Sequence, residues 1–409
     1  MLLIKNIGKI VRAIPSKDYK ESYQELPYLD DAWILIEKEL IHSMGTMDKD
    51  LPNAEEIIDA KGRYVFPSWC DSHTHLVFAG SRELEFEDRI RGLSYQEIAM
   101  RGGGILNSAK RLQQTSFEDL LAQAKIRLSE VAKMGTGLIE MKSGYGLNTL
   151  AELKILRVIK ELKKTSLVEI KSTFLGAHAI PLEYKEDRAG YIKLIIEDML
   201  PKIAEEKLAD YIDVFCEKVA FTTQETTAII QAGKKYGLKA KIHTNQFYSL
   251  GGIELAIEND ALSVDHLEVM TDEEIKLLAN SKVIPTLLPS APFFLNDPYP
   301  PARKMIDAGL KPALATDYNP GSSPSGNMNL AISLACVKMR MLPAEAINAA
   351  TLYGAKALEM DDKFGSIKVG GMASLFISKP IPSIAFLPYS FGQHSVEGVV
   401  LKGKAMGEM

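Results

Sequence analysis

The chain has 409 residues, of which 46% are hydrophobic and 25% charged, so it can bury a substantial core and lies far from the composition of a disordered protein. A formal net charge of -5, with no basic stripe interleaved with aromatic residues, argues against a nucleic-acid partner. The apolar N-terminal run is too short for a secretory signal and no later run approaches membrane-spanning length, so we expect a cytoplasmic protein with no membrane partner.

The two ends of the chain share one pattern. The first 60 or so residues carry short strand-like runs, such as 32–36, and no long helical pattern. Runs at 373–377 and 398–404 are also typical of strands and turns. We therefore expect a small β-sandwich domain formed from both ends of the chain, residues 1–63 and 361–409.

Between these ends, β-rich runs alternate with helical patterns. Helices are expected at 147–164 and 224–236, and Ser116 followed by Asp119 resembles the capping box that begins another. The expected strands are 64–70, 137–142, 169–175, 211–216, 239–243, 261–266, 283–288 and 311–316. Alternation repeated about eight times predicts an α/β fold, a TIM-like (β/α)8 barrel over residues 64–360.

Two histidines follow the first predicted barrel strand directly. In an extended backbone, residues i and i+2 project to the same side, so His73 and His75 can reach one metal ion from a strand end. The alternative is two surface histidines in a loop. Because the chain has only 7 histidines, a pair at this spacing favours metal ligation.

Other rare polar residues also follow predicted strands. His178 follows the third strand, His243 and His266 end the fifth and sixth, and Asp317 follows the eighth. Active sites on parallel barrels form at the C-terminal strand ends, so these side chains are expected to converge. A single histidine is usually a satisfied core residue, but so many at one rim indicate a functional site.

The proposed metal ligands are His73, His75, His243 and Asp317. Three nitrogens and one oxygen would leave a position for water, which suits one divalent ion per chain, with Zn²⁺ preferred and iron or manganese as alternatives. The ion would lower the pKa of its water, and Asp317 or the neighbouring His266 could remove and redeliver the proton. No lysine after the fourth strand indicates a carbamylated bridge, so one metal is the simpler interpretation.

Seven motifs carry a resemblance to a known family. They are DSHTHLVFAGSR at 71–82, GGGI at 102–105, KSGYG at 142–146, FLGAH at 174–178, HTNQ at 243–246, DHLE at 265–268 and TDYNPGSSP at 316–324. With them, the chain from about residue 66 to 358 resembles the amidohydrolase superfamily and, within it, the imidazolonepropionase family. The paired histidines and the late aspartate mark only the superfamily, and the other motifs narrow the resemblance.

The resemblance implies a metal-dependent hydrolase that opens the ring of 4-imidazolone-5-propanoate at a C–N bond, giving N-formimidoyl-L-glutamate in histidine degradation. Its substrate is a small molecule, and a homodimer is expected. Arg82 would bind the propanoate carboxylate through its planar guanidinium group, and Tyr145 would add a hydroxyl donor. A surface ion pair with Glu83 or Glu85 is the alternative for Arg82.

Further substrate contacts are expected around the ring. His178 would polarise the ring carbonyl or stabilise the developing oxyanion, and Gln246 would hydrogen-bond the ring nitrogens. The far side of the substrate would be contacted by Asn319, Gly321 and Ser322. Asn245 and Ser322 depart from residues common in the family, but both retain hydrogen-bonding ability.

Three points stay open at this stage. Asp265 and Glu268 are expected to orient imidazole rings, with a solvated face as the alternative for Glu268. The glycines at 102–104 lack the Gly-Lys-Ser/Thr of a phosphate loop and are expected to form a mobile loop over the site. The rival functions are another amidohydrolase, such as an aryl deaminase or a cyclic-imide hydrolase, and a non-catalytic metal-binding barrel.

Overall fold

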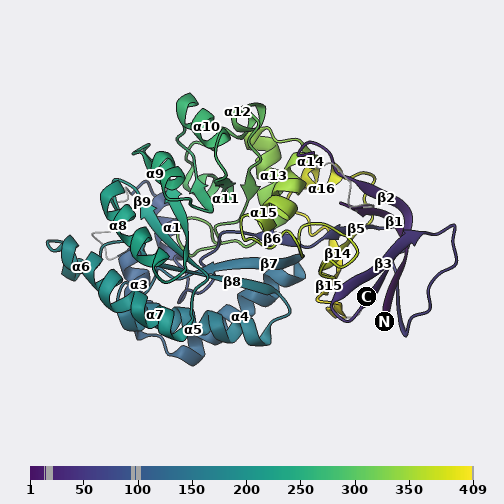
Figure 1. Cartoon of the computed structure of the whole chain (residues 1–409), viewed down its shortest axis with the longest axis horizontal. Helices are drawn as coiled ribbons and strands as arrows, with labels where there is room; N and C mark the ends of the chain where they lie inside the picture. Colours follow the sequence, from purple (N-terminus) through teal and green to yellow (C-terminus); the bar gives the residue numbers. More distant parts are fainter. Residues whose placement is uncertain (13, 15–21, 94–96, 98–102, 408–409) are drawn as a thin grey trace.

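The computed structural model describes residues 1–12, 14, 22–93, 97 and 103–407. A barrel surrounded by helices makes up most of the molecule, and a smaller sheet domain lies at one end of it (Figure 1). The N- and C-terminal segments both belong to this smaller domain (Figure 1). Within the described residues, no helix is both long and apolar enough to cross a membrane.

Eight parallel strands form the barrel and follow one another in chain order. They are β6 (Trp69–Asp71), β7 (Thr136–Lys142), β8 (Glu169–Ala177), β9 (Tyr211–Cys216), β10 (Lys239–Thr244), β11 (Ser263–His266), β12 (Ile284–Leu287) and β13 (Ala313–Leu314). Just beyond β6 and β13, Asp317 N donates to His73 O at 3.0 Å. At the same seam, His75 N donates to Tyr318 O at 2.9 Å. The expected TIM-like barrel is therefore confirmed and nearly closed.

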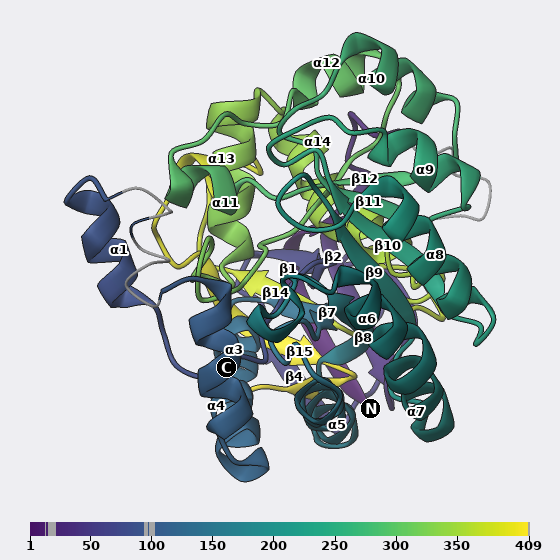
Figure 2. The ribbon, with the colours of Figure 1, turned by 90° about the vertical axis from the view of Figure 1, so that its left-hand side faces the viewer.

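Helices cover the outside of the barrel (Figure 2). They are α1 (Glu83–Ile90), α3 (Ile105–Gln114), α4 (Phe117–Lys133), α5 (Thr149–Thr165), α6 (Arg188–Leu194), α7 (Leu200–Glu206), α8 (Thr223–Lys234), α9 (Gly252–Glu258), α10 (Asp272–Ala279), α11 (Ser290–Leu295), α12 (Ala302–Asp307), α13 (Met328–Met339), α14 (Pro343–Asn348), α15 (Gly354–Lys356) and α16 (Phe386–Tyr389). A 3-10 turn, η1 (Leu182–Tyr184), precedes α6. Two π-helical turns, η2 (Ile195–Met199) and η3 (Ala349–Tyr353), join α6 to α7 and α14 to α15.

The helices expected from the sequence are present. Those expected at 147–164 and 224–236 are α5 and α8. Ser116 begins α4, and its side chain accepts a hydrogen bond from Asp119 N at 3.0 Å. The buried residues of α4 recur at helical spacing, so its apolar face packs on the barrel; they are Leu120, Ala124, Leu128, Val131 and Ala132.

The ends of the chain form a second sheet of eight strands, in the order β16-β15-β14-β5-β1-β2-β3 with β4 paired to β1. They are β1 (Leu2–Val11), β2 (Tyr28–Glu37), β3 (Leu40–Thr46), β4 (Glu56–Asp59), β5 (Tyr64–Pro67), β14 (Leu375–Ser378), β15 (Val396–Leu401) and β16 (Lys404–Ala405). The sheet is continuous because β1 pairs with β2 along one edge and with β4 and β5 along the other. A separate apolar core joins both ends, including Ile4, Ile34 and Leu375. The small β domain formed from both ends is therefore confirmed.

One predicted strand is wrong in detail. The run 64–70 was expected to be a single barrel strand, but it divides into β5, which pairs with β1 and β14, and β6, which pairs with β7. The chain crosses between the sheets at Ser68, whose N donates to Ser374 O at 3.0 Å. Both halves are almost wholly buried, so an uninterrupted apolar run gives no sign of the change of sheet. The expected domain boundaries at 63/64 and 360/361 stay predictions.

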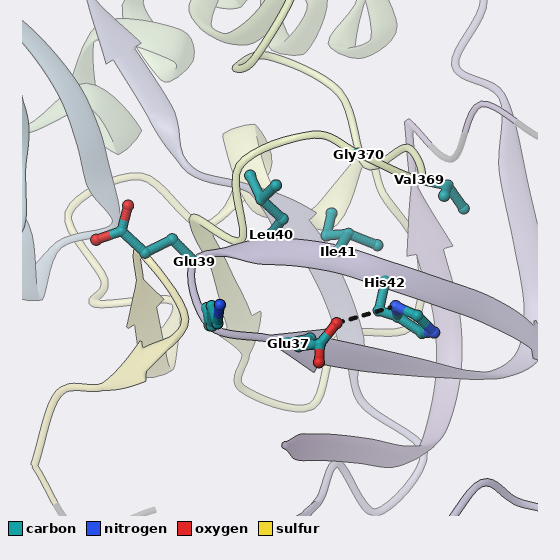
Figure 3. A pocket seen from close by; sticks show the side chains of 8 residues that line it. Glu37, Glu39, Leu40, Ile41, His42, Val369 and Gly370 are labelled. Carbon is teal, nitrogen blue, oxygen red and sulfur yellow. Dashed lines mark ion pairs between the residues drawn. The ribbon is translucent and has the colours of Figure 1, made fainter.

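The small domain carries a hollow of about 580 Å³ at the turn between β2 and β3 (Figure 3). It is lined by residues 37–42 together with Val369 and Gly370. Glu37 and His42 form an exposed ion pair there, with 3.4 Å between Oε2 and Nδ1 (Figure 3). None of the predicted site residues lines this hollow, so the candidate site lies instead at the rim of the barrel.

Candidate active site

The four predicted ligands come together at the C-terminal ends of β6, β10 and β13. The Nε2 atoms of His73 and His75 each lie 3.5 Å from Asp317 Oδ1. His243 Nε2 lies 3.4 Å from His75 Nε2. Bonds of about 2.0–2.2 Å to a tetrahedral ion place neighbouring ligand atoms roughly 3.3–3.6 Å apart. The spacing of these donor atoms therefore fits a metal ion.

Burial prepares the histidines for ligation. His73 and His75 are almost fully buried, and burial lowers the pKa of each imidazole well below its ordinary value. A neutral imidazole keeps a lone pair for a metal, whereas an imidazolium ion does not. His73 Nε2 is buried without a hydrogen-bond partner. An unpartnered buried nitrogen that faces other donor atoms is what a metal site requires.

Carboxylates fix the far side of two of these rings. His73 Nδ1 lies 2.7 Å from Asp265 Oδ2, so the expected orienting contact of Asp265 is present. His243 Nδ1 lies 2.9 Å from Asp213 Oδ2. Asp265 accepts a hydrogen bond from His73 Nδ1, and Asp213 makes an ion-pair contact with His243 Nδ1, so the Nε2 atom of each ring is left to face the metal position. Sequence reasoning missed Asp213, although an acidic residue inside an otherwise apolar strand is itself a signal.

The two oxygens of Asp317 have different surroundings. Oδ1 faces two ligand imidazoles, and Oδ2 accepts a hydrogen bond from Ser322 Oγ at 3.3 Å. Burial raises the pKa of Asp317 to about 7, against the opposing effects of His266, Asn319 and Ser322. A bound cation would oppose this rise. The backbone of Asp317 has φ +54°, a conformation rare for residues other than glycine and typical of functional positions.

The amide of Asn319 organises the loop after Asp317. Its Nδ2 donates to Asp317 O at 2.6 Å and to Ser322 Oγ at 2.8 Å. Its Oδ1 accepts from Gly321 N and Ser322 N, both at 2.8 Å. This side chain therefore holds the loop that presents Asp317, and direct contacts of Asn319, Gly321 and Ser322 with substrate remain predictions.

His266 lies beside the ligands with a carboxylate behind it. Its ring centroid is 5.8 Å from that of His73 and 5.5 Å from that of His243. Its Nδ1 lies 3.3 Å from Glu268 Oε1, and the Glu268 side chain is only 2% exposed. The solvated face considered for Glu268 is therefore wrong. Burial lowers the pKa of His266. The nearby carboxylates of Glu268 and Asp317 raise it by more, so the pKa lies above its ordinary value.

His178 stacks on a ligand ring. Its centroid lies 5.0 Å from that of His75 with nearly parallel planes, and Tyr145 packs against both rings. His178 Nδ1 lies 3.1 Å from Gly144 O, which can only accept a hydrogen bond. The proton of the neutral ring is therefore on Nδ1, and Nε2 is an acceptor. Burial lowers the pKa of His178 to about 3, so the neutral form prevails.

The loop that carries Tyr145 is held from beneath by Glu152 of α5. This fully buried carboxylate accepts hydrogen bonds from Gly144 N at 3.0 Å, Gly146 N at 2.7 Å and Leu147 N at 2.9 Å. Sequence reasoning missed Glu152 because its spacing resembles that of an ordinary helix residue. A buried acid in the first turn of a helix that follows a glycine-rich loop is the signal that could have found it.

Arg82 lies next to the Asp317 loop, in an ion pair with Glu85. Arg82 Nε and Nη2 donate to Glu85 Oε2 at 2.8 and 2.5 Å, and Glu85 Oε1 accepts from Gly104 N at 3.0 Å. Each partner is only 11% exposed, so this is a largely buried pair and not the surface pair considered from sequence. A Cβ on Gly321 would lie 2.2 Å from Arg82 Nη1, so only glycine permits this approach.

Two predicted features lie at the margin of this site. Gln246 follows β10 and is half-buried. The next two backbone nitrogens, of Phe247 and Tyr248, donate to Glu217 Oε1 at 2.8 and 3.1 Å and fix the path of this loop. Of the glycines expected to form a loop over the site, Gly102 lies outside the described residues.

Comparisons with known proteins identify the family of the chain. The model of the amidohydrolase family matches residues 64–406. Imidazolonepropionase of Christiangramia forsetii is 55% identical over 408 residues, covering 98% of this chain and 99% of the relative. That of Alkaliphilus metalliredigens is 40% identical, covering 98% and 97%. The chain belongs to the imidazolonepropionase family of amidohydrolases.

Solved structures support the fold. A triazine hydrolase variant aligns with a TM-score of 0.76 at 16% identity, covering 99% of this chain and 94% of that one. An adenosine deaminase from Xanthomonas campestris with bound zinc aligns with a TM-score of 0.70 at 17% identity, covering 99% and 92%. Family membership makes the chain a hydrolase, and the cluster of histidines and aspartate supports a metal cofactor.

Proposed function

We propose that this amidohydrolase opens the ring of 4-imidazolone-5-propanoate. Water adds to the ring carbonyl carbon, the adjacent C–N bond breaks, and the products are a carboxylate and a formimidoyl amine, together N-formimidoyl-L-glutamate. The observation that carries the proposal is the convergence of three imidazoles and Asp317 at one rim, with the buried Arg82 beside them. The relatives that share 40–55% of the sequence are named for this activity.

The metal site we propose holds one divalent ion, with zinc preferred and iron as the alternative. Its ligands are His73, His75, His243 and Asp317. When bound, such an ion lowers the pKa of a water molecule and polarises a carbonyl oxygen. Lys142 Nζ lies 2.7–3.6 Å from three carboxylates behind the ligands. The ammonium group of Lys142 thus already balances negative charge behind the ligands, so these carboxylates do not need a second metal ion. This supports a site with a single ion.

Two neighbouring groups are proposed to move protons. Asp317 Oδ2, which accepts a hydrogen bond from Ser322 Oγ, is the oxygen proposed to take a proton from the attacking water. His266, whose pKa is raised, can deliver a proton to the departing ring nitrogen. Glu268, bound to the other nitrogen of His266, holds that ring in position.

The substrate carboxylate is proposed to bind at the Nη1 edge of Arg82, which donates to none of the described residues, with the Tyr145 hydroxyl as a second donor. Glu85 already occupies Nε and Nη2, which fixes the plane of the guanidinium group before substrate arrives. Burial raises the pKa of Tyr145, so its hydroxyl keeps the proton that it would donate. A preorganised donor pair binds a carboxylate with less loss of entropy.

The tautomer of His178 refines its proposed role. With the proton on Nδ1, its Nε2 accepts a hydrogen bond and suits a ring N–H of the substrate. Stabilising an oxyanion would require the imidazolium form, which burial disfavours. Gln246 remains the proposed partner of the ring nitrogens, since an amide can both donate and accept.

The decisive experiment is a turnover assay with freshly generated 4-imidazolone-5-propanoate on protein whose metal content is measured in the same sample. Loss of the ultraviolet absorbance of the ring, with stoichiometric appearance of N-formimidoyl-L-glutamate by mass spectrometry, is expected. Turnover of aryl amines or cyclic imides in place of this substrate would favour another amidohydrolase. Metal-loaded protein with no turnover at all would favour a non-catalytic barrel. The expected homodimer is checked by sedimentation.

A further inference from the structure

A cluster of five buried charged residues fills the barrel directly behind the proposed ligands. We call it the barrel cluster, and its members are Glu140, Lys142, Asp213, Lys241 and Asp265. Each is at most 1% exposed. Barrel interiors are usually packed with branched apolar residues, and taking charges out of water is costly. A cluster of this size therefore requires a function that apolar packing would not serve.

Strand geometry shows how members of the barrel cluster lie relative to the ligands and to one another. Lys241 and His243 are two apart on β10, so both point into the barrel and Lys241 lies deeper. Glu140 and Lys142 have the same spacing on β7. Together with the carboxylates from β9 and β11, these side chains form a floor beneath the metal position.

One ammonium group contacts both carboxylates that orient the ligand rings. Lys142 Nζ lies 2.7 Å from Asp213 Oδ2 and 3.6 Å from Asp265 Oδ2. These same oxygens lie 2.9 Å from His243 Nδ1 and 2.7 Å from His73 Nδ1. Lys142 is thus one contact away from two ligands that come from different strands.

We propose that Lys142 is a positioning residue for the metal centre: its ammonium group fixes Asp213 and Asp265, and through them holds the Nε2 atoms of His243 and His73 toward the ion. Without this charge, Glu140 and the two aspartates would repel one another in a region from which water is excluded. The carboxylates would then turn away from one another, and neither imidazole would keep its orientation. The proposal rests on the metal site proposed above.

Lys142→Met tests this proposal, because methionine keeps much of the volume and removes the charge. Metal is stripped from the chain, and zinc affinity is measured by competition with a chromogenic chelator. Loss of an outer contact to a metal ligand typically costs about 10–100-fold in metal affinity, and we expect a loss in that range. The visible spectrum of the cobalt-loaded protein should also change, because two ligand rings lose their fixed orientation.

Lys241→Met is the matched control. Lys241 is equally buried in the same cluster, but its Nζ contacts backbone oxygens of Ser72 and Ala357 at 3.2 and 3.5 Å and lies 4.0 Å from Asp265 Oδ2. No contact of Lys241 with Asp213 exists among the described residues. We expect the logarithm of the zinc affinity to fall in this variant by less than about one third of its fall in Lys142→Met. If both variants lost the same zinc affinity, the effect would come from removing any buried lysine of the cluster and not from the contacts of Lys142. That result would overturn the proposal.

A double variant tests the proposal if Lys142→Met alone does not fold. Lys142→Met with Glu140→Gln removes one positive and one negative charge together, so the net charge of the barrel cluster is unchanged. It should fold, by circular dichroism and thermal unfolding, and still bind zinc at least about 10-fold more weakly than the unaltered chain. Unaltered zinc affinity and cobalt spectrum in a folded variant would overturn the role of Lys142 alone. An unaltered chain that binds no zinc would overturn the proposed metal site as well.

Discussion

His73 and His243 each use both ring nitrogens, one toward a buried carboxylate and one toward the metal position. This arrangement is costly to lose, because removal of either ring deprives a buried aspartate of one of its partners. It also means that ligation depends on residues from four strands, β6, β9, β10 and β11. Three predictions at the scale of the residue follow from this and from the neighbouring side chains.

His73→Ala and His243→Ala should each lose most of the bound metal and the activity. Each removes one of four donor atoms, and structural adjustment cannot replace a buried imidazole. Elemental analysis of the purified variants gives the metal content. His42→Ala, which alters an exposed histidine in the small domain, should retain both. Full metal and full activity in both site variants would disprove the ligand assignment.

Arg82→Ala should raise KM for the substrate while metal content stays unchanged. Loss of a desolvated carboxylate partner costs on the order of 2–5 kcal/mol in kcat/KM. Steady-state kinetics test it, and Arg91→Ala is the matched control because Arg91 pairs with Glu87 at the exposed end of the same helix. Normal kinetics in Arg82→Ala would leave the pair with Glu85 as the sole role of this arginine.

Asp317→Asn should keep some metal yet lose most of kcat. Asparagine retains an oxygen donor of the same size, but it cannot accept the proton of the attacking water. His266→Ala should lower kcat more than it raises KM. Metal content and single-turnover rates separate binding from chemistry. Near-normal turnover by metal-loaded Asp317→Asn would assign the base to His266, or to His178 if His266 also proves dispensable.

At the scale of the element, the site is formed by the ends of strands and the turns that follow them. His266, the last residue of β11, and Leu267, which follows it, have φ of +91° and +70°, and Asn245, after β10, has φ of +55°. Such conformations cost of order 1–3 kcal/mol each and persist only where the surrounding structure enforces them. These backbone conformations therefore lower the local stability of the strand ends, and they direct the side chains into the site.

Glu152→Ala should disturb one of these turns without affecting the metal. Three backbone N–H groups of the Tyr145 loop would lose their buried acceptor, at a cost of about 1–3 kcal/mol each where water cannot replace it. The expected result is a higher KM, unchanged metal content and a lower melting temperature. Glu161→Ala is the control, because this residue pairs with Lys164 near the other end of the same helix. Unchanged KM in a destabilised Glu152→Ala would limit Glu152 to a structural role.

At the scale of the whole molecule, the small domain is tied to the barrel by a buried arginine. Arg12, at the end of β1, is fully buried, and its guanidinium group contacts Asn348 of α14 and donates to Ser366 Oγ at 3.2 Å. The amide of Asn348 donates in turn to Tyr23 O at 2.8 Å. These contacts join segments more than 300 residues apart, so the two ends of the chain fold together with the barrel.

Arg12→Met should lower the free energy of unfolding by about 2–3 kcal/mol, because hydrogen bonds to a buried charged group are lost. Denaturant unfolding followed by circular dichroism measures the change. Zinc affinity and KM should stay within a factor of two, since Asn348 and Ser366, the described partners of Arg12, are not among the proposed ligands. Arg157→Met, which alters a half-exposed pair with Glu206, should change stability by less than about 1 kcal/mol. Equal stability of both variants would show that the tie contributes nothing.

The sequence by itself determined the barrel, the small β domain and the convergence of His73, His75, His243 and Asp317 at one rim. Alternation of strand and helix patterns is local, and the rim position of a residue follows directly from the strand that precedes it. A residue's place in the site can therefore be predicted from the sequence wherever it depends only on position along a strand. The division of residues 64–70 between two sheets could not be predicted from the sequence, because both halves are largely apolar.

Only the tertiary structure decided which partner each polar side chain takes. Lys142 of β7 and Asp213 of β9 are 71 residues apart in sequence, and only the packing of the strands into a barrel brings their side chains together. Burial, which sets the direction of the pKa of Asp317 and His178, depends on neighbours from the entire fold. Pairing and desolvation are properties of three-dimensional packing. Local pattern cannot encode them, and for that reason the floor beneath the metal site became visible only in the structure.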